Sequence, residues 1–247
     1  MIRQARGGLP VAGPRMGFRA RVVSSRRLTP TTHAIEVEKP ASFRFRATQF
    51  TFLQLMTEAG VDVRAMSLAT SPTHPHLEYA IRLSNSWYKR AFAALRPGDV
   101  VAAFGPIGDF VLHETRPAIL VAGGIGVTPL KGMAEYATDR GLTIPIRLVY
   151  SSRGEDEIVY RDELAALERA NPHFRVLHTL TGEVGRGWEG AKGRIDGKLL
   201  REGARDLADP IYYVSGAPSL VVDTWRLLRE EGIPAQSIEV EAFRGYR

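Results

Sequence analysis

The chain has 247 residues, of which 44% are apolar, and these values suit a globular protein of one large or two small domains. It contains no cysteine, which excludes disulfide bonds, thiolate nucleophiles and cysteine-ligated iron–sulfur clusters from its chemistry. The net charge of +6 would suit an acidic partner, but the excess comes from the arginines of residues 1–27, so we expect no nucleic-acid binding.

The first segment, residues 1–16, is rich in glycine, proline and arginine, and we expect it to be a disordered leader. It lacks the apolar stretch of a secretory signal. No apolar run elsewhere approaches the roughly 20 residues of a membrane-spanning helix. We therefore expect a cytoplasmic protein with no membrane span.

Residues 17–115 are expected to form a first domain of short β-rich runs separated by turn residues. Such spacing is typical of a small six-stranded antiparallel β-barrel. One helix is predicted to interrupt it, at residues 86–95. The predicted strands are residues 19–23, 34–37, 50–56, 61–69, 77–83 and 100–104.

Residues 116–247 are expected to form a second domain, with the boundary near residues 113–117. Strands and helices alternate here, which predicts a doubly wound parallel sheet that binds ligands at the carboxyl ends of its strands. The predicted strands are residues 118–122, 144–150, 174–179, 211–215 and 238–241. The predicted helices are residues 129–140, 160–169 and 218–230.

The first strand of this second domain runs into a glycine-rich turn, residues 123–129, with the sequence Gly-Gly-Ile-Gly-Val-Thr-Pro. Glycines let the backbone approach a pyrophosphate, and free N–H groups at a helix N-terminus attract phosphate. Thr128 is expected to cap a helix that Pro129 begins. Because Pro129 replaces the third glycine of the common dinucleotide fingerprint, the motif alone also fits a tight turn without a ligand.

The next strand ends at Ser151, Ser152 and Arg153. An arginine beside hydroxyl groups at this place suits a 2′-phosphate, so NADPH is favoured over NADH. The acidic residues 155–157 follow closely and leave open the alternative that Arg153 is a solvated loop residue.

Two segments of the first domain are further candidates for anion binding. Residues 64–67 (Arg-Ala-Met-Ser) end a predicted strand, where an arginine and a hydroxyl could hold a phosphate. Residues 84–86 (Ser-Asn-Ser) lead into a helix, and Ser86 as its N-cap leaves N–H groups free for an anion. Taken singly, both segments are also ordinary surface loops.

In their order and spacing, the motifs of residues 17–247 resemble the ferredoxin–NADP reductase superfamily, as a stand-alone reductase without an iron–sulfur domain. Residues 64–67 are similar to its R-x-Y-S flavin motif, with Met66 in the tyrosine position. Residues 49–50 match its GQF turn, with Thr48 replacing the glycine, and residues 105–110 its G-P-x-G-x-F segment. Residues 124–129 resemble its G-x-G-x-x-P turn. Residues 213–218 resemble its Y-x-C-G-x-P motif, with Ser215 replacing the cysteine, and the chain closes like its E-x-F-x-G-Y tail.

The resemblance implies that the barrel binds FAD, which is favoured over FMN, and that the sheet binds NAD(P)H. It implies flavin contacts from Arg64, Ala65, Met66, Ser67, Ser84, Asn85, Ser86, Trp87, Tyr88, Lys89, Phe243 and Tyr246. It implies nucleotide contacts from Gly124, Gly126, Val127, Thr128, Pro129, Ser152, Arg153, Tyr160, Arg161, Ser215, Gly216 and Ala217. The candidates for positioning the reacting rings are Ser67, Ser215, Glu241 and Tyr246, and no metal is expected.

The activity that this resemblance implies is hydride transfer between NADPH and bound FAD, followed by electron transfer to a carrier protein such as ferredoxin or flavodoxin. Two alternatives stay open from the sequence. One is a reductase of free flavin, quinone or other small acceptors. The other is a non-catalytic flavin- or nucleotide-binding module of a larger complex, for which the substitutions at Met66 and Ser215 leave room.

Overall fold

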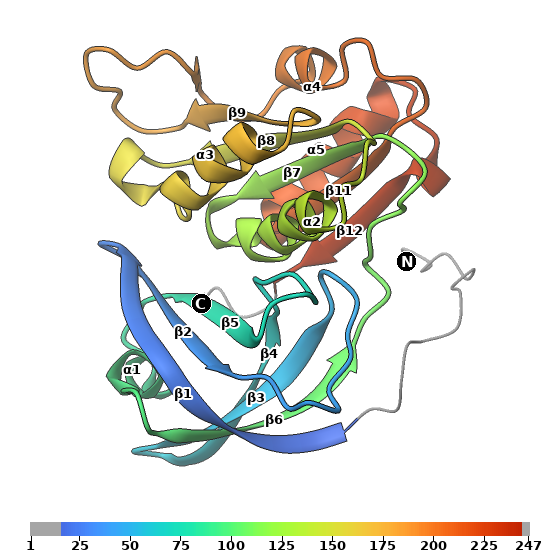
Figure 1. Cartoon of the computed structure of the whole chain (residues 1–247). Coiled ribbons are helices and arrows are strands. Elements are labelled where there is room, and N and C mark those ends of the chain that lie inside the picture. Colours follow the sequence, from blue (N-terminus) through green and yellow to red (C-terminus); the bar gives the residue numbers. More distant parts are fainter. Residues whose placement is uncertain (1–15, 244–247) are drawn as a thin grey trace.

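The computed structural model describes residues 16–243, which form two bodies lying one above the other, each built on a six-stranded sheet (Figure 1). Residues 1–15 of the predicted leader lie outside the described residues, whereas Met16 is the first residue of a strand. None of the helices between residues 16 and 243 is long and apolar enough to cross a membrane.

The lower body in Figure 1 is a curled antiparallel sheet with the strand order β4-β3-β6-β1-β2-β5. Its strands are β1 (Met16–Thr29), β2 (Thr32–Glu38), β3 (Phe50–Thr57), β4 (Gly60–Ser67), β5 (His76–Arg82) and β6 (Val100–Ile107). Burial alternates along β3, so one side of the strand faces the inside of the curl. The helix α1 (Trp87–Ala94) packs against β3, and Leu53, Tyr79 and Phe92 share one buried apolar cluster.

The upper body is a parallel sheet with the strand order β10-β9-β8-β7-β11-β12. Its strands are β7 (Ala118–Gly123), β8 (Ile146–Ser152), β9 (Phe174–Leu180), β10 (Ala191–Lys192), β11 (Ile211–Gly216) and β12 (Ile238–Ala242). Its helices are α2 (Val127–Asp139), α3 (Arg161–Ala170), α4 (Gly197–Gly203) and α5 (Pro218–Glu230), and 3₁₀ turns form at Gly124–Gly126, Glu155–Glu157 and Ala235–Ser237. Helices α2 and α3 contribute to one apolar cluster and α4 and α5 to another, so helices cover both faces.

These two sheets confirm the predicted fold class, and every predicted strand and helix is present within a few residues. β1 is much longer than the predicted residues 19–23, and the short elements β10 and α4 were not predicted. The predicted cap at Thr128 is wrong. The helix begins earlier, at Val127 with Gly126 as its N-cap, and the Thr128 hydroxyl donates instead to the carbonyl oxygen of Ile125 at 3.0 Å.

The two bodies share apolar packing. Ala69 and Ala80 of the curled sheet belong to the same buried cluster as Leu130 and Met133 of α2. The predicted boundary, residues 113–117, falls in the connection between β6 and β7. The glycine-rich turn touches β5, so the two bodies are in contact next to this turn.

Candidate active site

The carboxyl edge of the parallel sheet carries polar atoms that are buried and have no hydrogen-bond partner. They are the Ser152 hydroxyl at the end of β8, the Ser215 hydroxyl on β11 and the Glu241 carboxylate oxygen Oε2 on β12. An unpaired buried polar atom costs free energy, and native structures pair most of them. Three such atoms at one sheet edge indicate a site where a ligand supplies the missing partners. In Figure 1 the arrowhead of β12 points toward the curled sheet, so the carboxyl end of this strand faces the other body.

The glycine-rich turn lies directly against the end of β11. A Cβ atom at Gly126 would fall 2.3 Å from the carbonyl oxygen of Ser215 and 2.5 Å from the Cα of Gly216, so only glycine fits this approach. Gly124 has a φ of 52°, which glycine adopts at no steric cost. No side chain caps this helical run at Gly123 or Gly126. The amide of Val127 donates back to the carbonyl oxygens of Gly124 and Ile125, and Pro129 has no N–H, so a phosphate would bind the N–H groups of the glycine-rich turn itself, at residues 124–126.

Glu241, on the outermost strand β12, is the ionisable group among these three residues. Burial raises its pKa to about 8, so a large share of it keeps its proton at neutral pH. Beyond it, the amide of Phe243 donates to the carbonyl oxygen of Gly216 at 2.9 Å, which fixes this segment across the end of β11. The Phe243 side chain is partly buried against the apolar cluster, and Tyr246 lies outside the described residues.

The curled sheet gathers three cations near the start of α1. Burial lowers the pKa of Lys89, and the positive charges of Arg82 and Arg64 lower it further. Arg64 pairs with Asp62 at 2.8 Å and lies 5.7 Å from the centre of the Tyr88 ring. Between residues 16 and 243, neither Lys89 nor Arg82 pairs with a carboxylate. Cations held together in this way indicate an anion site, and Arg82 is a member that the sequence did not suggest.

The predicted loop before α1 provides the N-cap of this helix. The Ser86 hydroxyl caps α1 by accepting from the amide of Lys89 at 3.4 Å, as predicted. Ser84 and Asn85 are exposed beside it. Trp87 is 48% exposed, with the Arg90 guanidinium 4.2 Å from its ring centre.

Tyr88 and Met66 point into the barrel rather than to the surface. The Tyr88 hydroxyl donates to the carbonyl oxygen of Leu53 at 3.0 Å. Met66 is 7% exposed and belongs to the same buried cluster, while Ala65 is exposed and Ser67 is half-buried at the end of β4. Of the flavin motif, only Arg64, Ala65 and Ser67 therefore offer substantial surface to a ligand.

Of the residues predicted for the adenosine end of a nucleotide, the two arginines are exposed and the tyrosine is buried. Arg153 is exposed, and its carbonyl oxygen accepts from the amide of Gly182 at 2.8 Å. Arg161 is exposed and pairs with Glu155 at 3.4 Å. Tyr160 is only 2% exposed, so in this conformation it presents no open ring face to an adenine, and its stacking role stays a prediction.

Sequence reasoning missed His178, whose Nδ1 atom is buried without a hydrogen-bond partner. It is the register partner of Tyr150 and packs on Trp188, with ring centres 6.2 Å apart. Burial lowers its pKa to about 4, with help from the positive charge of Arg161, so it is neutral at neutral pH. A single histidine in a buried strand carries no signal that would have identified it.

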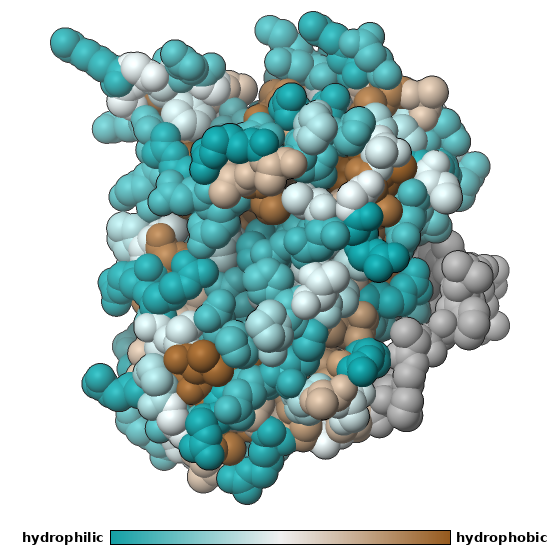
Figure 2. All heavy atoms as spheres, in the orientation of Figure 1, coloured by the Kyte–Doolittle hydropathy of each residue, from teal (hydrophilic) through white to brown (hydrophobic). Residues whose placement is uncertain are grey.

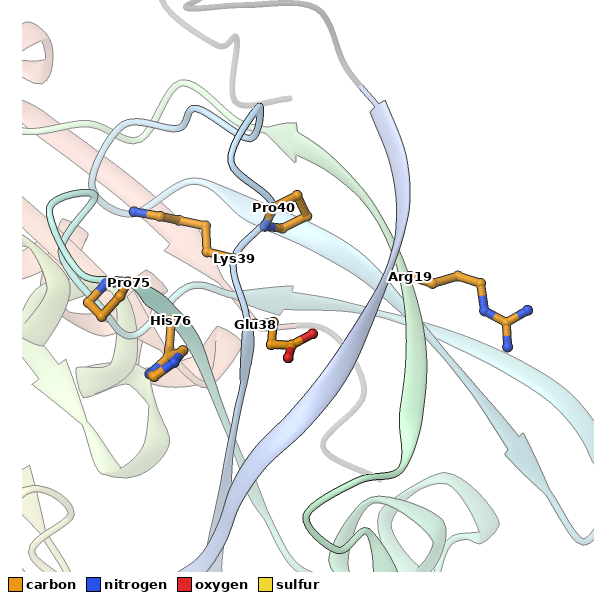
Figure 3. Close-up of a pocket in the computed structure, with 6 residues that line it drawn as sticks. All are labelled: Arg19, Glu38, Lys39, Pro40, Pro75 and His76. Carbon is orange, nitrogen blue, oxygen red and sulfur yellow. The ribbon is translucent and has the colours of Figure 1, made fainter.

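Two surface hollows of the curled sheet do not resemble this site. One, of about 400 Å³, is lined by residues of β1, β2 and β5, whose charged groups Arg19, Glu38 and Lys39 point in different directions (Figure 3). The other, of about 440 Å³, lies over the outer face of β3, β4 and β6, next to Phe52 and Phe104. Neither has the converging polar groups of a ligand site.

Comparison with known proteins gives consistent matches. Residues 120–225 match the family model of the oxidoreductase NAD-binding domain. The chain is 32% identical to ferredoxin–NADP reductase B of Sorangium cellulosum, over 92% of this chain and 97% of that protein. It is 24% identical to the glycine betaine monooxygenase reductase subunit of Chromohalobacter salexigens, where it covers 86% of its own length but 60% of that longer protein. The solved ferredoxin NADP⁺ reductase from Neisseria gonorrhoeae with bound FAD and NADP has the same fold, with a TM-score of 0.79 at 21% identity over 92% of this chain and 98% of that chain.

Proposed function

Because the chain belongs to the ferredoxin–NADP reductase superfamily and is a flavin-dependent NAD(P)H oxidoreductase, we propose that it takes a hydride from NADPH and passes electrons to a carrier protein such as ferredoxin or flavodoxin. The observation that carries this proposal is the pair of unpartnered polar atoms of Ser215 and Glu241 at the edge of the parallel sheet, in a chain whose curled sheet gathers three cations near the start of α1.

FAD fits the curled sheet. Arg64, Arg82 and Lys89 would hold its two phosphates together with the free N–H groups that begin α1. Ser67, at the end of β4, would donate to the edge of the flavin ring. The bound flavin supplies the redox chemistry, because it exchanges a hydride with nicotinamide and gives up its electrons singly.

The nucleotide fits the parallel sheet. The N–H groups of the glycine-rich turn at residues 124–126 would bind the pyrophosphate, and Arg153 the 2′-phosphate that distinguishes NADPH from NADH. The tight contact between Gly126 and Ser215 places the glycine-rich turn at the end of β11, where the nicotinamide would lie. Because burial raises the pKa of Glu241 to about 8, its carboxyl group is largely protonated at neutral pH and would donate a hydrogen bond to the reacting rings.

A carrier protein is the acceptor that this chain's composition and relatives favour. The sequence has no cysteine to hold an iron–sulfur cluster, so an acceptor of single electrons would lie outside these 247 residues. The names of two relatives, a ferredoxin–NADP reductase and a monooxygenase reductase subunit, name a ferredoxin and a monooxygenase beside the reductase.

Turnover with different acceptors tests the proposal. Purified protein with NADPH is assayed against reducible ferredoxin and flavodoxin, and in parallel against free FMN, a quinone and a ferric chelate. We expect kcat/KM for at least one carrier protein to exceed that for every small acceptor by tenfold or more. Equal or better turnover of the free flavin or the quinone would contradict the carrier assignment and leave the NADPH oxidation intact.

A further inference from the structure

Helix α2 extends from one proposed ligand site to the other. Its first residue, Val127, follows the glycine-rich turn that we assign to the nucleotide. Its middle turns lie on residues 68–71, which directly follow the flavin motif at the end of β4. Any shift of α2 along this contact would change the separation between the two motifs.

Gly132 is where the helix meets this segment most closely. A Cβ atom built there would lie 3.2 Å from the carbonyl oxygens of both Leu68 and Thr70, so the contact is between helix and backbone with no side chain between them. The segment is itself fixed to the curled sheet. The amide of Leu68 donates to the carbonyl oxygen of Gln49 at 3.1 Å, and the amide of Ala69 donates to the carbonyl oxygen of Glu78 at 2.9 Å. The surface on which α2 rests is therefore rigid.

Lys131, the neighbour of Gly132, fixes the position of the helix through ion pairs. Its side chain is 6% exposed, and its Nζ lies 3.4 Å from Glu78 of β5 and 3.3 Å from Glu135 of α2. Glu135 in turn accepts a hydrogen bond from the amide of Ser71 at 2.8 Å. A buried charge whose partner is removed is strongly unfavourable, so this network specifies one seating of the helix.

The same network reaches the next helix. Arg26 of β1 pairs with Glu78 at 2.7 Å and with Glu163 of α3 at 3.0 Å. On the face shown in Figure 2, the junction between the two bodies is mostly hydrophilic. Polar contacts with fixed geometry, added to the apolar contacts, restrict sliding of one body over the other.

We propose that Gly132 and Lys131 are positioning residues for hydride transfer, because they seat α2 on residues 68–71 and so set the distance between the nucleotide turn and the flavin motif. This inference rests on the proposed function. Neither residue needs to touch a ligand. Their effect would fall on the rate of the hydride step, since a misplacement of about 1 Å can slow a reaction roughly 100-fold while leaving binding intact.

The test compares Gly132→Ala, Gly132→Val and Lys131→Met with two matched controls. Gly17→Ala places a methyl group on a β1 glycine whose nearest neighbour would be 3.9 Å away. Arg201→Met removes a charge from the α4 ion pair with Glu231, away from the junction. Flavin content, NADP⁺ affinity and the limiting rate of anaerobic flavin reduction by NADPH are measured for each, with NADPH and with NADPH deuterated at nicotinamide C4.

We expect the three junction variants to keep flavin content and NADP⁺ affinity within about twofold of the unmodified chain. The limiting rate should fall at least threefold in Gly132→Ala and Lys131→Met and further in Gly132→Val, with a full deuterium isotope effect. A misplacement of about 1 Å slows a reaction roughly 100-fold, and a shift of a few tenths of an ångström should cost part of that effect. The controls should match the unmodified chain. Partial misfolding would lower the amplitude of reduction and not its rate.

Unchanged limiting rates in all three junction variants would overturn the positioning role and leave the proposed function standing. Losses of flavin or nucleotide affinity equal to the loss of rate would also overturn it, because the residues would then be merely structural. If the unmodified chain with bound flavin is not reduced by NADPH at all, the proposed function itself fails, and this inference fails with it.

Discussion

Ser215 and Glu241 are register partners on the neighbouring parallel strands β11 and β12, and each holds a buried oxygen without a hydrogen-bond partner. Two unsatisfied groups side by side at the carboxyl edge of a sheet are unfavourable for folding alone. A ligand with polar ring edges would supply the missing hydrogen-bond partners. These two groups are the structural basis of the proposed site.

The first prediction concerns Glu241 in the flavin-free protein. Its folded-state pKa of about 8 lies above the ordinary value of 4.5, so the stability it contributes is complete below pH 4.5 and is lost as the pH rises to about 8. A difference of one between the folded and unfolded pKa values corresponds to about 1.4 kcal/mol of stability. Glu241→Gln should therefore be more stable than the unmodified chain at pH 9, by at least about 1 kcal/mol, and gain much less at pH 5. Urea unfolding at both pH values measures this, with the exposed Glu202→Gln as control, and the same difference at both pH values would rule out a raised pKa.

The second prediction concerns flavin binding. Arg64→Ala removes one of the three cations gathered near the start of α1, so purified protein should lose most of its flavin, with the affinity falling roughly tenfold or more. The ratio of flavin to protein absorbance measures the loss. Arg19→Ala, a change of the same kind on the exposed face of β1, serves as the control. Full yellow colour in Arg64→Ala would remove the arginine from the phosphate site.

The third prediction concerns nucleotide choice. Arg153→Ala should raise the KM for NADPH about tenfold and leave the KM for NADH within about twofold, because only NADPH carries the phosphate that a guanidinium binds with two hydrogen bonds. Steady-state kinetics with both nucleotides measure the split, with the exposed Arg169→Ala on α3 as control. Equal effects on the two nucleotides would show that Arg153 does not read the 2′-phosphate.

The fourth prediction concerns the close approach at the glycine-rich turn. Gly126→Ala would bring a methyl group to 2.3 Å from the Ser215 carbonyl oxygen, and backbone on both sides must move to admit it. We expect a loss of roughly 1–3 kcal/mol in the free energy of unfolding and weaker NADPH binding. Urea midpoints and nucleotide titrations measure both. Gly185→Ala, where the added carbon would lie 3.6 Å from Glu155, should change little, and a Gly126→Ala variant as stable as this control would refute the contact.

The fold could be predicted because periodicity and turn residues recur along most of the chain. β1 was underestimated because its second half, with Arg26 and Arg27, reads as polar. Arg26 lies in a strand because its backbone pairs with Ala34 of β2. Its side-chain partners Glu78 and Glu163 are 52 and 137 residues away, and no local pattern reveals them. The helix α4 was missed because it has seven residues and a glycine at each end, although Asp196 caps it by accepting from the amide of Leu199.

The site could be predicted where a motif fixes the backbone and less well where long-range packing decides. Ser86 caps α1, as the sequence predicted, and the glycine-rich turn forms between β7 and α2, where it lies against Ser215. Thr48, in place of the family glycine, keeps a φ of 80°, so the turn survives a substitution that disfavours it. The burial of Tyr160 could not be predicted from its motif, because the ring is buried beside Lys131 at the junction between the two bodies.

Anaerobic titration of the purified protein with NADPH tests the central claim most directly, that a flavin bound between the curled sheet and the parallel sheet accepts a hydride from the nucleotide. We predict that the isolated protein carries about one flavin per chain and that one equivalent of NADPH bleaches its yellow absorbance, with slower bleaching in Ser215→Val. A protein that holds no flavin after reconstitution with FAD, or whose bound flavin stays oxidised in excess NADPH, would contradict the account.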